Sequence, residues 1–143
     1  MPVTITNNIH VLNKALAKAM SLGLDQAGQY LEGKIVENIR SNMPPPNAPL
    51  TIALKGSSST LIDTGEMMNA VTSEKKSGTE IWVGVFGSEN AKKALINEFG
   101  APAAAIPSRP FIRNAINDQS DKTAMNEKVV KEIRGAIASS VIK

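Results

Sequence analysis

The chain is organised around residues 97–113, which read NEFGAPAAAIPSRPFIR. Gly100 follows a helical run and can adopt the positive φ that ends a helix without strain at Cβ. Pro102 and Pro107 then keep the following backbone out of a helix. The sequence therefore predicts that a helix ends at Gly100 and that residues 101–106 form a stiff, extended, apolar linker.

A second helix is expected to begin directly after this linker. Pro110 suits the first turn of a helix, with Ser108 or Arg109 as the N-cap. Phe111 belongs to a chain in which aromatic residues make up only 3%, so we expect the core to bury it. An ion pair between Glu98 and Arg109 would hold the two helix ends together, and a contact of these charges with a partner protein is the alternative.

An apolar stripe at helical spacing runs through residues 9–42. A helix of about 30 residues would be about 45 Å long, which exceeds the ~25–30 Å expected across a domain of this size. We therefore expect part of it to overhang or to pack against a neighbouring subunit. Gly23 interrupts the stripe and indicates a kink or a close packing contact. The stripe consists of Leu12, Leu16, Met20, Leu24, Ala27, Leu31, Ile35 and Ile39.

Three consecutive prolines at positions 44–46 end this helix. Residues 44–60 are rich in Pro, Ser, Gly and Thr, which predicts a long loop that is mobile or takes part in assembly. Within it, Leu50, Ile52 and Leu54 alternate with other residues, as in a marginal edge strand.

Residues 61–68, LIDTGEMM, indicate a turn that leads into a short helix. Asp63 or Thr64 would accept hydrogen bonds from free backbone amides, and Glu66 would complete a capping box. The alternative is that Asp63 and Glu66 are paired carboxylates for acid–base chemistry. The stretch around Gly65 lacks the Gly-Lys-Ser/Thr ending of a phosphate loop.

The best strand pattern covers residues 79–86, with apolar side chains on both faces. We expect burial on both sides or the use of one face in an interface. A turn signal at residues 76–78 precedes the strand, and a short helical pattern over 91–99 follows it. After Asp118 a second helical stripe begins: Met125, Val129, Ile133, Ile137 and Val141.

These patterns predict one α+β domain over residues 1–143. A long N-terminal helix and a C-terminal helix would pack on a small, mainly antiparallel β-sheet, with a long Pro/Ser-rich loop over residues 44–60. Residues 1–8 are expected to form a short N-terminal arm, without the pattern of a secretory signal. No apolar run approaches the ~20 residues that span a bilayer, so we expect no contact with a membrane.

Composition gives little support for catalysis. The chain has no cysteine and a single histidine, His10, for which we expect no catalytic or metal-binding role. We therefore predict no enzyme, no metal and no cofactor. A small enzyme that uses Asp63, Glu66 and Glu98 is a remote alternative.

The net charge of +3 is mild, and the charges mostly alternate in sign along the chain. Basic residues cluster at four lysines and at the two arginines of the central stretch. Because no aromatic side chains accompany them for base stacking, these basic residues do not favour binding of a single-stranded nucleic acid. A small nucleic-acid-binding module remains the alternative function, with Lys75, Lys76, Lys92, Lys93, Arg109 and Arg113 as its contacts.

Three motifs follow one another within residues 44–116, after the loop sequence PNAPLTIALKG. They are LIDTGEMMNAV at 61–71, ALINEFG at 94–100 and IPSRPFI at 106–112. In this order they resemble the tail-completion or neck proteins of long-tailed bacteriophages, a family also labelled phage virion morphogenesis or putative tail-component proteins. Asn97 and Glu66 depart from the family pattern, which often has His and a basic residue there.

The resemblance implies a structural virion protein without enzymatic activity. Such a subunit forms a homo-oligomeric ring, a hexamer, that joins or seals the head–tail junction in the virion neck or tail after assembly in the host cytoplasm. Its partners would be head-completion, tail-terminator or tail-tube subunits, and DNA would pass non-specifically through the lumen. Motif residues would serve the subunit interface or the structure: Asp63, Thr64, Gly65, Glu98, Phe99, Gly100, Arg109, Pro110 and Phe111. Basic residues that could face the DNA channel are Lys75, Lys76, Lys92 and Lys93.

Overall fold

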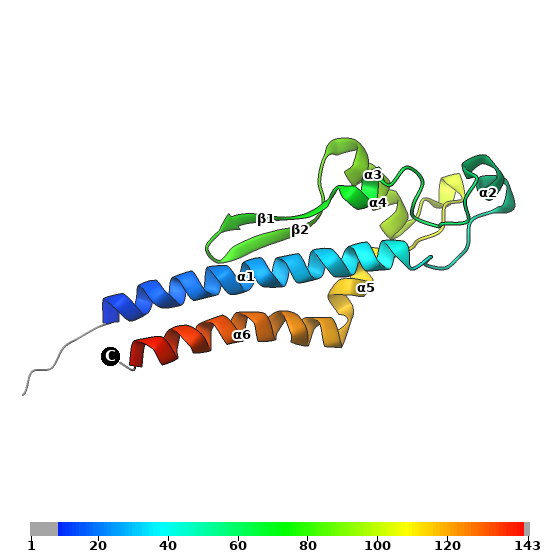
Figure 1. Ribbon diagram of the computed structural model, residues 1–143. Helices are drawn as coiled ribbons and strands as arrows, with labels where there is room; N and C mark the ends of the chain where they lie inside the picture. Colours follow the sequence, from blue (N-terminus) through cyan, green and yellow to red (C-terminus); the bar gives the residue numbers. More distant parts are fainter. Residues whose placement is uncertain (1–8, 142–143) are drawn as a thin grey trace, which may run out of the picture.

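A computed structural model describes residues 9–141, and the predicted arm over residues 1–8 lies outside this range. The fold is α+β, as the sequence predicts. Two long helices and a β-hairpin form an elongated body, and short helices gather in a head at one end of it (Figure 1). The elements are α1 (Ile9–Arg40), α2 (Pro49–Lys55), α3 (Glu66–Asn69), β1 (Val71–Ser77), β2 (Glu80–Val85), α4 (Ser88–Phe99), the 3-10 turn η1 (Pro102–Ala104), α5 (Phe111–Asn117) and α6 (Gln119–Val141).

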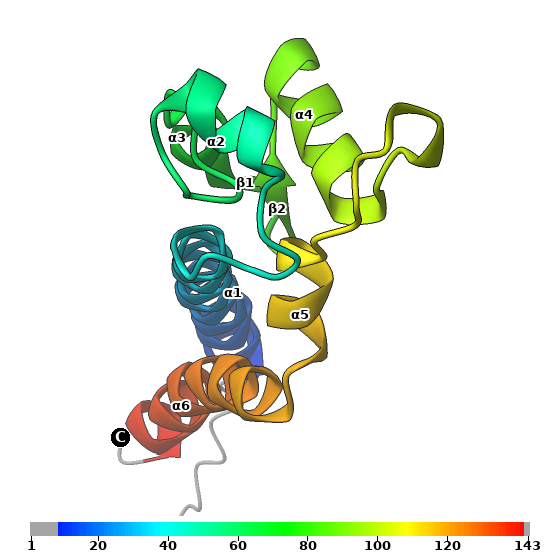
Figure 2. The same cartoon turned by 90° about the vertical axis from the view of Figure 1, so that its right-hand side faces the viewer.

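The predicted long helix is α1, and α6 runs antiparallel beside it (Figure 1). The hairpin lies on the opposite side of α1 (Figure 2). Much of the length of α1 is thus covered within the chain, which the sequence did not indicate. Gly23 is a close packing contact, because a Cβ at this position would lie 2.6 Å from the Cα of Val129 in α6.

Strands β1 and β2 pair antiparallel, from Val71 opposite Val85 to Ser77 opposite Glu80. On the face toward α1, Ile81 packs so closely on the helix that a Cβ at Gly28 would overlap its side chain. On the other face Trp82 is exposed. Only one face of β2 is therefore covered within the described chain.

The core lies where the C-terminal half of α1 meets α5 and the head. Phe111 is completely buried, as predicted, together with Ile35 and Ile39 of α1. A buried phenyl ring of this kind contributes about 3–5 kcal/mol relative to alanine. The buried cluster comprises Ile35, Ile39, Met43, Leu61, Met67, Val71, Ala94, Phe111 and Ala115.

The prediction of an edge strand near Leu50 is wrong, because residues 49–55 form helix α2. Pro49 occupies its first turn, where a proline costs no hydrogen bond. Gly56 ends it in the left-handed conformation, and the Gly56 amide donates to the carbonyl of Ile52. The 44–60 segment is therefore a loop that contains a short helix.

The prediction of an extended linker after Gly100 is also wrong. Ala101 and Ile106 exchange two backbone hydrogen bonds as an antiparallel bridge, and a 3-10 turn closes between them. The chain between them is short and rich in alanine, so it can fold back without burying a side chain. The resulting loop projects from the head beside α4 (Figure 2).

Candidate functional site

The Glu98 carboxylate joins the end of α4 to the beginning of α5. It accepts hydrogen bonds from the backbone amides of Ile112 at 2.9 Å and Arg113 at 3.0 Å, two of the free donors in the first turn of α5. The first turn of α5 carries partial positive charge, which stabilises the buried carboxylate of Glu98. Glu98 thus caps α5 in place of the N-cap expected at Ser108 or Arg109.

The ionic partner of Glu98 is Arg113 and not Arg109, so the predicted pair is wrong. The Arg113 Nε donates to Glu98 at 2.9 Å, and its guanidinium also lies 4.8 Å from the centre of the Phe99 ring. Arg113 lies in the first turn of α5, close to the capped amides, whereas Arg109 precedes the helix and points elsewhere.

Arg109 binds the loop that follows α1. Its Nε donates to the carbonyl of Pro45 at 2.9 Å, and its Nη2 donates to Asn47 Oδ1 at 3.1 Å. The side chain is only 4% exposed and forms no ion pair with a described carboxylate. Burial lowers the pKa of the guanidinium, which nevertheless stays charged at neutral pH.

Gly100 is required by its surroundings. Its φ is +78°, and a Cβ there would lie 2.9 Å from the Ser108 amide and 3.0 Å from the Ile106 carbonyl. Ser108 also holds the end of α4 in place, because its hydroxyl donates to the carbonyl of Glu98 at 2.7 Å. The second and third motifs thus form one compact joint between α4 and α5.

Only part of the capping predicted for the Asp63 turn is present. Gly65, with φ +86°, occupies the N-cap position of α3 without a side-chain cap, and Thr64 Oγ1 accepts only a long hydrogen bond, 3.4 Å, from the Glu66 amide. The Glu66 carboxylate pairs with Lys93 of α4 at 3.1 Å. The predicted capping box is therefore absent, because its glutamate points to α4.

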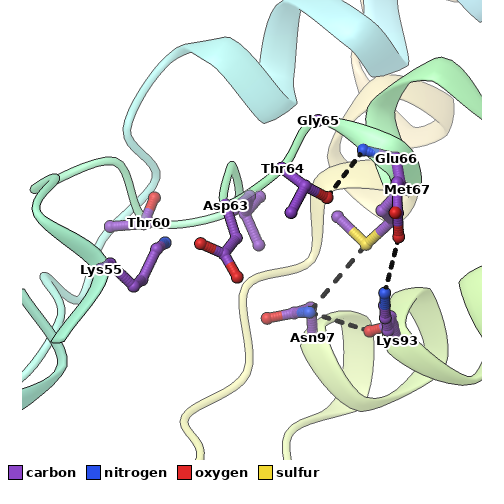
Figure 3. A pocket seen from close by; sticks show the side chains of 10 residues that line it. Lys55, Thr60, Asp63, Thr64, Gly65, Glu66, Met67, Lys93 and Asn97 are labelled. Atoms are coloured by element: carbon purple, nitrogen blue, oxygen red, sulfur yellow. Dashed lines mark hydrogen bonds and ion pairs between the residues drawn. The ribbon is translucent and has the colours of Figure 1, made fainter.

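A small pocket of about 210 Å³ lies between this turn and α4 (Figure 3). Asn97 donates to the backbone carbonyl of Lys93 at 2.8 Å and closes one side of it. Asp63 lies on the other side, exposed and away from the start of α3. The paired carboxylates considered for acid–base chemistry are thus not a hydrogen-bonded pair.

A larger groove, of about 620 Å³, separates α2 and the preceding loop from the 101–106 loop. Arg109 lies in its lining, and so does Lys55, whose Nζ donates to the carbonyls of Ser59 and Ile62 at 2.8 Å each. No pattern in the sequence connects Lys55 with Arg109, since only the fold of residues 44–60 brings them together. The lining consists of Pro46, Asn47, Ala48, Thr51, Lys55, Thr60, Asn97, Ala104, Ala105, Ile106, Pro107 and Arg109.

The four lysines considered for a DNA channel each have an acidic partner within the chain. On the hairpin, Lys75 pairs with Asp25 of α1 at 2.7 Å, and Lys76 pairs with Glu74. On α4, Lys92 pairs with Glu89, and Lys93 pairs with Glu66 as described above. They therefore do not form one unneutralised basic face.

Two short helices of the head carry large apolar side chains into solvent. Leu50 and Leu54, one turn apart on α2, are 70% and 80% exposed. Leu95 and Phe99, one turn apart on α4, are each 60% exposed. We call these pairs the α2 ridge and the α4 ridge, and their helices lie on different sides of the head (Figure 2).

Among residues 9–141, no three His, Asp or Glu side chains are grouped so that they could hold a metal ion. Within the same residues, no helix has the length and apolar character to cross a membrane. Comparisons of the chain with protein-family models, with curated proteins and with solved structures found no match.

Proposed function

We propose that this protein is a structural subunit that assembles into a ring at the head–tail junction of a long-tailed bacteriophage. The resemblance of residues 44–116 to tail-completion and neck proteins suggests the assembly. The observation that carries the proposal is the pair of exposed ridges on the head, because two large apolar side chains one turn apart on an exposed helix face suit a contact with another protein.

The two ridges favour a head-to-tail contact between copies. They lie on different helices, α2 and α4, so the α2 ridge of one copy can cover the α4 ridge of the next. A contact between two different patches leaves one free patch at each end of a dimer, and a ring forms when the rotation between copies closes. Burying one fully exposed leucine stabilises a contact by about 1.5–3 kcal/mol. The four apolar side chains of two facing ridges would therefore form the apolar centre of the contact.

The role of the ring would be mechanical, to join or seal the junction around the DNA channel. Non-specific passage of DNA needs no unpaired basic face, which agrees with the paired lysines of the hairpin and α4. For the alternative, a nucleic-acid-binding module, a continuous basic face would be expected.

The test uses two single variants, Leu54→Lys and Leu95→Lys, each of which inactivates one ridge. Native mass spectrometry should detect rings for the unchanged protein and monomers for either variant alone. A mixture of the two should form dimers, because each variant supplies the ridge that the other lacks. In an extract that lacks the protein, only the unchanged form should restore the joining of heads to tails.

Val11→Lys is the matched control, because Val11 is equally exposed but lies at the far end of α1. It should leave ring formation unchanged. Monomers at every concentration, together with failure to restore head–tail joining, would refute the proposal. Rings that persist in both ridge variants would show that other surfaces form the contact.

A further inference from the structure

The groove between α2 and the 101–106 loop has an unusual charge distribution. Two of its lining residues, Lys55 and Arg109, are cations, and none is acidic. Neither cation forms an ion pair with a carboxylate among the described residues, whereas all four lysines of the hairpin and α4 do. The groove is thus a concave site that is lined by two cations and by no carboxylate.

Arg109 has unused hydrogen-bonding capacity in this groove. A guanidinium has five N–H donors, and Pro45 and Asn47 accept from two of its nitrogens, Nε and Nη2. Among the described residues, the side-chain atoms that are both fully buried and without a partner are Thr60 Oγ1 and Asn90 Oδ1. The remaining nitrogen of Arg109, Nη1, is not among these atoms, so it is not fully enclosed, and Arg109 itself lines the groove.

We infer that the groove binds a carboxylate side chain on an extended segment of a partner protein. The planar guanidinium suits a carboxylate, and the partly desolvated setting strengthens their hydrogen bonds. The volume of the groove, about 620 Å³, lies within the range of about 300–1,000 Å³ typical of ligand sites. The inference concerns a single copy of the chain, so it does not depend on ring formation.

The walls favour a peptide over a nucleic acid. Pro46, Ala48, Ala104 and Pro107 offer small apolar surfaces on which an extended chain with short side chains can lie. Binding of a nucleic acid rests on several phosphate contacts from many basic residues, whereas this groove has two cations and no aromatic side chain for stacking.

The experiment is an NMR titration of the ¹⁵N-labelled full chain with two blocked peptides, Ac-Ala-Pro-Glu-Ala-NH₂ and its glutamine analogue, and with inorganic phosphate at equal ionic strength. The glutamate peptide should cause saturable shifts of the Arg109 Nε–H signal and of groove amides. The glutamine peptide should bind about tenfold more weakly, because it lacks the charge.

Ala104→Trp should fill the groove and abolish these shifts without touching the hydrogen bonds of Arg109. Ala103→Trp is its matched control, because Ala103 is exposed in the same turn but does not line the groove. Four outcomes would each overturn the inference. The two peptides bind with equal affinity, or phosphate binds more tightly than the glutamate peptide. Alternatively, the two Trp variants behave alike, or no saturable shift appears at tens of millimolar peptide.

Discussion

Replacement of Glu98 by alanine should be among the most destabilising single changes in this chain. The substitution removes the acceptor of two backbone amides, those of Ile112 and Arg113, and one side of an ion pair. Both amides are in the first turn of α5, where no intrahelical partner exists. Because the carboxylate is buried, water cannot replace it without rearrangement of the joint.

The size of the effect follows from these contacts. A hydrogen bond to a charged group contributes about 1.5–3 kcal/mol, so the loss of two costs about 3–6 kcal/mol. The Arg113 side chain is 48% exposed, so screening limits the ion pair to less than about 1 kcal/mol. Glu98→Gln keeps one acceptor oxygen and should lose about half as much, while Arg113→Ala should cost about 1 kcal/mol.

Urea denaturation at fixed protein concentration measures these differences in the free energy of unfolding. Glu89→Ala is the matched control, because Glu89 lies on the same helix in an exposed pair with Lys92 and should cost less than about 0.5 kcal/mol. The reasoning would be refuted if Glu98→Ala cost less than 1 kcal/mol. It would also fail if Arg113→Ala cost as much as Glu98→Ala, since the ion pair would then be the main contribution.

Four further substitutions test other parts of the fold by the same denaturation assay. Gly23→Ala should destabilise by about 1–2 kcal/mol, because the added Cβ would overlap α6. Gly33→Ala on the same helix meets no atom within 4 Å and should stabilise by up to about 1 kcal/mol. Equal effects of the two substitutions would contradict the close contact at Gly23. Asp63→Ala should change stability by less than about 0.5 kcal/mol because Asp63 caps no helix, and a loss of 1 kcal/mol would restore the capping hypothesis. Hydrogen bonds from the Ser120 hydroxyl and nearby amides lower the pKa of Asp118 in the folded state. The contribution of Asp118 to the free energy of unfolding is therefore present above its unfolded pKa and disappears as pH falls through its folded pKa. Asp118→Asn should destabilise at pH 7 and have little effect near pH 2, and an equal loss at both pH values would contradict this.

The long helices could be predicted from the sequence because their apolar stripes repeat over many turns. A stripe of eight residues at spacings of three and four fits only a helix, and α1 begins and ends close to the predicted limits. The strand β2 was also predictable, from alternation over residues 79–86. What the stripe did not reveal is which element covers it, since an apolar stripe packs equally well against a helix of the same chain or against another protein.

Helix α2 was missed because its pattern is ambiguous. Leu50, Ile52 and Leu54 satisfy the two-residue period of a strand, but the outer two also satisfy the four-residue spacing of a helix. Over seven residues the period cannot decide, and the signals that do decide are Pro49 at the start and Gly56 at the end. Reading these two residues as helix limits would have given the observed structure.

The partner of Glu98 could not be predicted, because two arginines lie one turn apart in the sequence. Which of them meets the carboxylate depends on how the 101–106 loop folds back, and its bridge between Ala101 and Ile106 has no distinctive sequence signal. The fold-back places the amides of α5 at Glu98 and directs Arg109 toward Pro45. Spacing alone therefore identified the right region and the wrong contact.

The motifs behind the phage resemblance are therefore mostly used inside the chain. Glu98 caps α5, Gly100 permits a turn that no other residue fits, and Phe111 fills the core. If the proposed ring forms, changes at these positions would disturb it through the fold, so a loss of assembly in such variants would not identify an interface. Residues that face solvent separate the two effects, which is why the α2 and α4 ridges are the better test of assembly.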